Sequence, residues 1–227
     1  MMKKIKALVF DVDGTLVKYA NSKFHSGWDA LGNCLDEKTK KVWFDNLEEY
    51  YPQKDKIIEW TEKDAALLKG FALKDTENTL FPNSVIPYNK GFVEFFNNIS
   101  NGYVVGMVSG GINLVTDKIR EDFPGKFDFV ITNILGVNNG YLDGTVKAFD
   151  MWKKDEILEN ILRTNYRLSL DNVCYVGDSR NDVCVLQKVG LPIVFDSKAA
   201  DNHEAKLFAR YVINDFQELS MILNDYS

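Results

Sequence analysis

The stretch from Lys6 to Val17 constrains the fold of this chain more than any other. It reads Lys-Ala-Leu-Val-Phe-Asp-Val-Asp-Gly-Thr-Leu-Val and follows Ile5, so a nearly continuous apolar run ends in two acids. Such a run is typical of a strand that is buried on both faces of a parallel sheet. Asp11 and Asp13 come where the strand should end, and Gly14 permits a sharp turn there. Taken alone, this is also an ordinary acidic turn, so later residues must decide whether the carboxylates carry chemistry.

Composition narrows the class of protein. The 227 residues are enough for one large domain, or for a core domain that carries a smaller one. A formal net charge of -6 argues against general binding to nucleic acid or to anionic membranes. The first apolar run is too short for a signal peptide or a membrane span, which predicts a cytoplasmic protein. The three cysteines form no Cys-x-x-Cys pair, so neither a disulfide framework nor a zinc site is expected.

After residue 17 the apolar pattern changes from strand-like to helical. We expect three helices, around residues 28–35, 36–50 and 54–71, and no strand before residue 85. The sequence therefore predicts a core domain made of residues 1–17 and 85–227, with a helical cap formed by residues 18–84. Trp28, Trp43 and Trp60 lie in this cap, where we expect them to be core residues rather than substrate contacts.

From residue 85 onward, expected strands alternate with expected helices. The strands are at residues 103–108, 127–131, 173–176, 192–195 and 210–213. The helices are at residues 89–99, 153–162 and 182–189, with one opened by Ser109-Gly110-Gly111 and one at the C-terminus, and residues 135–146 read as a β-hairpin. This alternation predicts a three-layer α/β domain around a mainly parallel sheet.

Four polar segments fall at the carboxyl ends of these strands, where open parallel sheets bind ligands. Each is ambiguous alone. A Ser-Gly-Gly after a strand is an ordinary helix entry as well as an anion cradle, and a lysine at a helix start is usually solvated. The many side-chain oxygens between Gly177 and Asp182 suit a turn as well as a hard cation. The segments are Asp11 to Thr15, Ser109 to Gly111, Lys153-Lys154 and Gly177 to Asp182.

Together, and in this order, the four segments resemble the motifs of the haloacid dehalogenase-like phosphohydrolase superfamily. The chain is most similar to its phosphoserine phosphatase group, with a helical insertion after the first motif, Ser-Gly-Gly as the second, a hairpin before the lysine and Gly-Asp-x-x-Asn-Asp as the fourth. The resemblance covers Ile5 to about Ile222 and is weakest in the cap. It implies a Rossmann-like core and a Mg²⁺-dependent phosphatase of a small phosphomonoester, present as a monomer or homodimer.

The resemblance also implies roles for the acidic residues. Asp11 would attack phosphorus and form an aspartyl phosphate, while Asp13 would protonate the leaving oxygen and later activate water. Mg²⁺ would be held by Asp11, the backbone carbonyl of Asp13 and Asp178. Asp182 and Asn181 would orient these ligands from behind.

The remaining motif residues would bind the phosphoryl group. Ser109 and the Gly110 amide would donate to phosphoryl oxygens, together with a lysine that restrains the charge of the nucleophile. We choose Lys154 over Lys153 because Lys-Asp-Glu-Ile-Leu better matches the family's lysine-led helix start. Thr15 would support the loop or donate to phosphate.

The cap departs from the phosphoserine phosphatase pattern where specificity should reside. A glutamate is expected shortly after the first motif, but the sequence there is Lys18-Tyr19-Ala20. A cap arginine is expected for the substrate carboxylate, but Arg120 is the first arginine in the chain. These differences leave open another small anionic metabolite as the substrate. Its contacts would come from residues that are more often solvated: Lys18, Lys23, His25 and Lys56.

Two readings from other classes also remain. A phospho-acceptor domain of the receiver type uses similar residues, but its acceptor is not followed by an aspartate two residues later and it needs no cap. A non-catalytic binding protein on the same fold is not excluded by the fold itself. A dehalogenase is disfavoured because Asp13 would be an idle acid in attack on a carbon–halogen bond.

Overall fold

A computed structural model describes residues 4–18, 26–197 and 202–226. Within them, strands form one seven-stranded sheet in the order β4-β3-β2-β1-β5-β6-β7. All neighbouring strands are parallel except β3 and β4. The α/β architecture predicted from the alternating pattern is confirmed. The strands are β1 (Ala7–Phe10), β2 (Val104–Ile112), β3 (Phe129–Asn138), β4 (Tyr141–Lys147), β5 (Val173–Gly177), β6 (Leu191–Phe195) and β7 (Tyr211–Ile213).

Strand β1 lies in the middle of the sheet, and all four of its residues are buried. Leu8 and Phe10 pack on one face, and Ala7 and Val9 pack on the other. This explains the continuous apolar run, because a strand covered on both faces has no solvent side to be polar. The carboxyl end of β1 therefore delivers Asp11 to the centre of one sheet edge.

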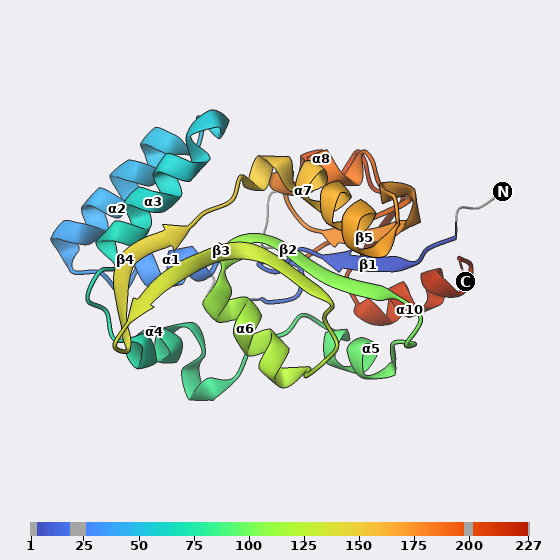
Figure 1. The fold of residues 1–227 in the computed structure, drawn as a ribbon, viewed down its shortest axis with the longest axis horizontal. Coiled ribbons are helices and arrows are strands. Elements are labelled where there is room, and N and C mark those ends of the chain that lie inside the picture. Colours follow the sequence, from blue (N-terminus) through green and yellow to red (C-terminus); the bar gives the residue numbers. More distant parts are fainter. Residues whose placement is uncertain (1–3, 19–25, 198–201, 227) are drawn as a thin grey trace.

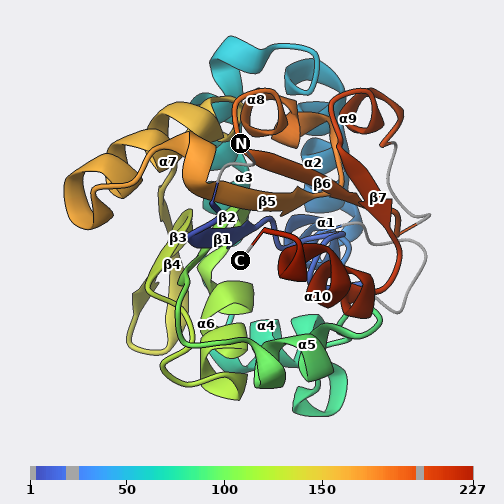
Figure 2. The same cartoon turned by 90° about the vertical axis from the view of Figure 1, so that its right-hand side faces the viewer.

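Helices cover both faces of the sheet, as Figures 1 and 2 show. Helices α7 (Lys154–Ile161) and α8 (Val183–Leu186) lie on one face. Helices α5 (Phe92–Asn98), α6 (Asn113–Asp122) and α10 (Phe216–Asn224) lie on the other. There the Phe10 ring packs against Phe216 at 6.2 Å between centroids and against Phe96 at 6.0 Å. The short helix α9 (His203–Lys206) was not predicted.

The insertion after β1 is helical, and in its described part, residues 26–84, it contains no strand. Helices α1 (Gly27–Gly32), α2 (Glu37–Tyr50) and α3 (Ile57–Leu67) lie close to the predicted positions. Helix α4 (Leu73–Leu80) was missed, because its start has no side-chain cap and its apolar residues are few. Helices α2 and α3 lie at the end of the molecule opposite the two termini (Figure 1).

Backbone hydrogen bonds join the insertion to the rest of the chain at its two ends and at the β3–β4 hairpin. Its entry and exit run side by side, with the Lys18 N–H donating to the Pro87 carbonyl at 2.7 Å. The tip of the β3–β4 hairpin bonds the segment after α3: Gly70 N–H donates to the Leu142 carbonyl, and Leu73 N–H to the Gly140 carbonyl, both at 2.8 Å. These contacts support our proposal of a core (1–17 and 85–227) and a cap (18–84).

The predicted boundary between the second strand and the helix after it is wrong. Strand β2 continues through Ser109-Gly110-Gly111, with an irregular register between Val108 and Ile112, and α6 begins only at Asn113. The Ser-Gly-Gly segment therefore does not open the helix. The reason is tertiary, since a side chain of the neighbouring strand β3, Asn133, donates to both glycine carbonyls and holds them in the sheet.

Across residues 4–18, 26–197 and 202–226, no helix combines the length and apolar character that crossing a bilayer requires.

Candidate active site

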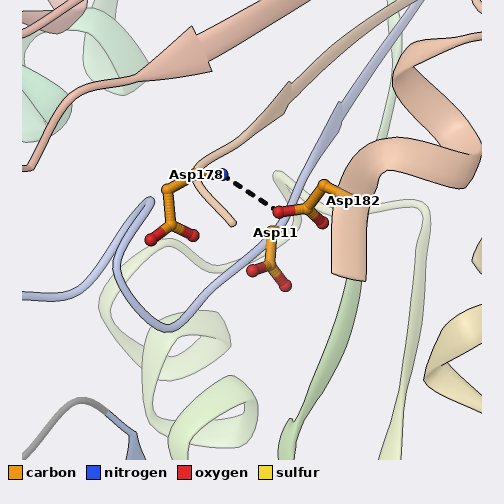
Figure 3. Close-up of side chains that lie close together, drawn as sticks. All are labelled: Asp11, Asp178 and Asp182. Atoms are coloured by element: carbon orange, nitrogen blue, oxygen red, sulfur yellow. Dashed lines mark hydrogen bonds between the residues drawn. The ribbon is translucent and has the colours of Figure 1, made fainter. Parts of the chain in front are cut away.

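Asp11 and Asp178 meet at the carboxyl edge of the sheet because their strands are neighbours. Strands β1 and β5 pair in parallel with Phe10 opposite Val176, and the Asp11 N–H donates to the Val176 carbonyl at 2.9 Å. Figure 3 shows the side chain of Asp11 between those of Asp178 and Asp182. Asp11 and Asp178 are almost completely buried, with 3% and 2% of their surfaces exposed.

Lys154, the first residue of α7, places a buried ammonium group against these acids. Its Nζ donates to Asp11 Oδ1 at 3.1 Å, to Asp182 Oδ1 at 2.7 Å and to Asn181 Oδ1 at 2.9 Å. Burial by itself lowers the pKa of Lys154, but the charges of Asp11 and Asp182 outweigh it and raise the pKa. The neighbouring Lys153 is exposed and pairs with Asp150 at 3.5 Å.

Asp182 uses both carboxylate oxygens to hold the surrounding loop. Oδ1 accepts from Lys154 and from the Tyr175 hydroxyl, both at 2.7 Å. Oδ2 accepts from the N–H groups of Asp178 at 3.0 Å and Ser179 at 3.1 Å; the first of these bonds is drawn in Figure 3. These four bonds suit Asp182 to orient its neighbours rather than to take up a metal ion itself.

The acidic cluster is short of positive charge. Asp11, Asp178 and Asp182 each offer one oxygen within 4.8 Å of the others. Burial raises the pKa of Asp11 to about 7 although Lys154 opposes the shift, and burial with the neighbouring Asp11 charge raises the pKa of Asp178 well above its usual range. Close, desolvated carboxylates of this kind fit a hard divalent cation.

Two glycines let carboxylates approach the backbone at this edge. Gly14 has a φ of +84°, and a Cβ there would lie 2.1 Å from Asp178 Oδ2. A Cβ on Gly111 would lie 2.4 Å from Asp13 Oδ2, so the half-buried Asp13 reaches across to the end of β2. The sequence placed Asp13 beside Asp11, whereas the packing also places it beside the Ser-Gly-Gly segment.

Thr15 has its hydroxyl group directed at a carboxylate. It is fully buried, and its Oγ1 donates to Asp178 Oδ1 at 3.1 Å. Asn89 supports the same loop, because its Nδ2 donates to the carbonyls of Gly14 and Thr15 at 2.8 Å each. Of the two predicted roles for Thr15, this arrangement favours loop support over donation to phosphate.

Several side-chain hydrogen bonds hold the Ser-Gly-Gly segment. The Gly111 N–H donates to Ser109 Oγ at 3.1 Å. Asn133 Nδ2 donates to the Gly110 carbonyl at 2.8 Å, and Trp28 Nε1 from the cap donates to the same oxygen at 3.1 Å. Sequence reasoning missed Asn89 and Asn133, since a single asparagine outside any motif has no local signal.

A cavity of about 430 Å³ opens from the acidic edge into the cap. On the core side it is lined by Asp11, Asp13, Ser109, Gly110, Gly111, Asn133, Phe149, Met151, Asp178, Ser179 and Asn181. On the cap side it is lined by Ser26, Trp28, Asp29, Trp43, Leu47, Tyr51, Ile57, Trp60, Thr61 and Asp64.

The cap tryptophans, which were expected to be core residues, also line this cavity. Trp43 is buried, with 3% of its surface exposed, but Trp28 and Trp60 are only half-buried, and all three line the cavity. The cap helices enclose an internal space, so their apolar faces turn toward it as well as toward one another.

Of the cations considered for substrate binding, the two that the structure describes do not line the cavity. Lys18 is exposed, and the Lys56 ammonium lies 5.9 Å from the centre of the Tyr50 ring; neither lines the cavity. Lys23 and His25 lie outside the described residues.

Comparison with known proteins gives a consistent result. A family model described as haloacid dehalogenase-like hydrolase matches residues 8–187. The phosphoserine phosphatase of Methanocaldococcus jannaschii is 31% identical over 201 residues, which cover 87% of this chain and 89% of that protein. A substrate-bound phosphoserine phosphatase structure has a TM-score of 0.72 and 27% identity, over 97% of this chain and 99% of that one. A structure titled as a phospho-aspartyl intermediate analogue of phosphoserine phosphatase has a TM-score of 0.71 and 28% identity, over 97% and 99%.

Proposed function

This chain belongs to the haloacid dehalogenase-like hydrolases, and we propose that it is a Mg²⁺-dependent phosphatase of a small phosphomonoester, with Asp11 as the nucleophile. The observation that carries the proposal is the buried contact of Asp11 with Lys154, beside Asp178 on the neighbouring strand end. The similar structure titled as a phospho-aspartyl intermediate analogue supports it.

The reaction that this geometry supports has two steps. A carboxylate oxygen of Asp11 attacks phosphorus, the ester P–O bond breaks, and Asp13 gives its proton to the leaving oxygen. Asp13, now a carboxylate, takes a proton from water as that water attacks phosphorus, which frees phosphate and restores Asp11. Ser109 and the Gly110 amide donate to the phosphoryl oxygens, and Lys154 offsets the charge at Asp11.

The residues present fit a bound Mg²⁺ ion. Asp11, Asp178 and the backbone carbonyl of Asp13 would hold it, and when bound it supplies positive charge that offsets the charge of the phosphate dianion. Asp182, with Asn181 beside it, keeps Lys154 and the Asp178 backbone in place. Thr15 orients Asp178.

Mg²⁺ should stabilise the protein through these acids. At a concentration of a hundred times the dissociation constant the ion adds about 2.7 kcal/mol, which raises Tm in thermal unfolding. Asp178→Asn should have a higher Tm than the wild type in EDTA, because a desolvated charge is removed, but its Tm should rise less at the same Mg²⁺ concentration because it binds the ion more weakly. Glu156→Gln, an exposed change on α7, is the matched control. Equal Mg²⁺ shifts in Asp178→Asn and the control would contradict the assignment.

Replacement of Asp13 and replacement of Asp178 should impair catalysis in different ways. Asp13→Asn removes the proton donor, so kcat should fall by about 10² to 10⁴ while the Mg²⁺ concentration for half-maximal rate stays unchanged. Asp178→Asn should chiefly raise that Mg²⁺ concentration. Initial rates of phosphate release measured across a Mg²⁺ series separate the two effects, and the same metal dependence in both variants would contradict the division of roles.

The test of the function itself is phosphate release from p-nitrophenyl phosphate and a panel of sugar, nucleotide and amino-acid phosphates, with Mg²⁺ and with EDTA. Metal-dependent turnover supports the proposal. Formation of a stable phosphoprotein without turnover would favour a phospho-acceptor domain, and no reaction would favour a binding protein. A cytoplasmic location and a monomeric or homodimeric state stay predictions.

A further inference from the structure

We propose that the cap selects a phosphate ester whose leaving group carries an ammonium ion and no carboxylate, that is, the phosphate of an amino alcohol. This inference rests on the proposed phosphatase function and concerns the cap side of the same cavity. The phosphoryl group is placed by the core residues, so the leaving group extends toward the cap.

The cap side of the cavity is rich in aromatic rings. Trp28, Trp43, Tyr51 and Trp60 all line it. The faces of such rings carry negative charge density and attract ammonium ions, including quaternary ones. Four aromatic side chains around one small cavity are therefore a suitable environment for a cation that has lost part of its water.

A buried carboxylate lies among these rings. Asp64 on α3 lines the cavity, with 5% of its surface exposed. Asn46 Nδ2 donates to its Oδ1 at 2.8 Å, which fixes its orientation. Burial raises the pKa of Asp64 to about 7, with only hydrogen bonds opposing the shift. A carboxylate in this position gains most from a cation that comes with the ligand.

The same lining disfavours an anionic leaving group. Among the residues that the structure describes, the cavity has no lysine, arginine or histidine in its lining, while Asp29 and Asp64 both belong to it. A substrate carboxylate, such as that of phosphoserine, would be desolvated here and repelled by Asp64. The absence of an arginine from the cap sequence therefore agrees with a cavity lining that disfavours a substrate carboxylate.

The ring geometry favours a compact cation over a flat base. The neighbouring rings of Trp28 and Trp43 are inclined at 41°, and those of Tyr51 and Trp60 at 87°. A flat heterocycle held between two rings needs parallel ring faces, whereas a rounded ammonium group is accommodated by rings at several angles.

The test compares esters that differ in charge. We expect kcat/KM for phosphocholine or phosphoethanolamine to exceed that for phosphoserine at least tenfold, with p-nitrophenyl phosphate as the uncharged-ring reference. The two amino-alcohol esters distinguish a quaternary from a primary ammonium group. In Asp64→Asn, the ratio of kcat/KM for the better amino-alcohol ester to that for p-nitrophenyl phosphate should fall at least tenfold, mainly through KM.

Glu62→Gln is the matched control, because Glu62 is an exposed acid on the same helix, and that ratio should stay within twofold of the wild type. A Tm measurement separates folding from recognition: Asp64→Asn should melt at or above the wild-type temperature at pH 8. Binding to the Asp11→Asn variant gives a second readout. Quenching of its tryptophan fluorescence should saturate at a lower concentration of phosphocholine than of phosphoserine.

Failure of this inference is distinct from failure of the proposed function. Turnover of p-nitrophenyl phosphate with a preference for phosphoserine or a nucleotide, or with no change of the ratio in Asp64→Asn, would overturn the inference alone. An absence of metal-dependent turnover of every ester would overturn the proposed function.

Discussion

Replacement of Asp11 by asparagine should reduce phosphate release by about 10⁴-fold or more while leaving the protein folded. An amide does not attack phosphorus, so the aspartyl phosphate cannot form. The fold should survive because asparagine has nearly the same size and Lys154 keeps its contacts with Asp182 and Asn181. The folded pKa of Asp11 lies near 7, above the usual value of 3.8, so its charge costs stability increasingly as the pH rises through this interval.

The measurements are steady-state phosphate release, thermal unfolding at pH 8 and rapid acid quench with ³²P-labelled substrate. The wild type should yield an acid-stable, hydroxylamine-sensitive phosphoprotein, and Asp11→Asn should yield none. Glu156→Gln serves again as the control for an acidic change outside the site. A labelled Asp11→Asn protein, or one with appreciable turnover, would show that another residue is the nucleophile.

Replacement of Lys154 by methionine should be the most destabilising single change in the site. Lys154 has no exposed surface and pairs with Asp11 and Asp182, so methionine keeps the packing but leaves two buried carboxylates uncompensated. Breaking a buried pair in this way costs about 3–5 kcal/mol. Turnover should fall as well, since the charge of the nucleophile and that of the phosphate are no longer offset.

Lys153→Met is the matched control, because Lys153 is the preceding residue but is exposed. Its effect on the free energy of unfolding should stay within about 0.5 kcal/mol. Urea unfolding at pH 5 and pH 8 adds a second criterion. The loss in Lys154→Met should be smaller at pH 5, where the carboxyl of Asp11 takes up a proton. Equal losses in the two lysine variants would contradict the buried role of Lys154.

Local patterns were sufficient for most of the fold. The apolar run before Asp11 predicts a doubly covered strand, and the structure buries all four residues of β1. Residues 135–146 predict the β3–β4 hairpin, whose turn lies at Asn139-Gly140. Helix α4 and the end of β2 escaped prediction, because the former has weak end signals and the latter depends on hydrogen bonds from Asn133, a residue of another strand.

The residues of the candidate site also differ in whether local sequence patterns predict them. Asp11, Asp13, Ser109, Lys154 and Asp178 each stand in a short motif, and motifs at the carboxyl ends of parallel strands meet at one edge whatever their separation in the chain. The sequence match favoured Lys154 over Lys153 only slightly. In the structure, Lys154 reaches Asp11, whereas Lys153 pairs with Asp150. Asn89 and Asn133 became visible only through their bonds to carbonyls of distant loops.

The sequence by itself determined the fold class, the family and the residues offered for phosphoryl chemistry, because these depend on periodicity and on short motifs placed at strand ends. Only the tertiary structure decided the character of the cap cavity. Its lining combines Trp28 and Asp64 from different helices with core residues such as Gly110, which is 82 positions from Trp28 and accepts a hydrogen bond from its indole. Whether a tryptophan fills a core or faces a ligand depends on how helices pack around a space, and no local spacing encodes that packing.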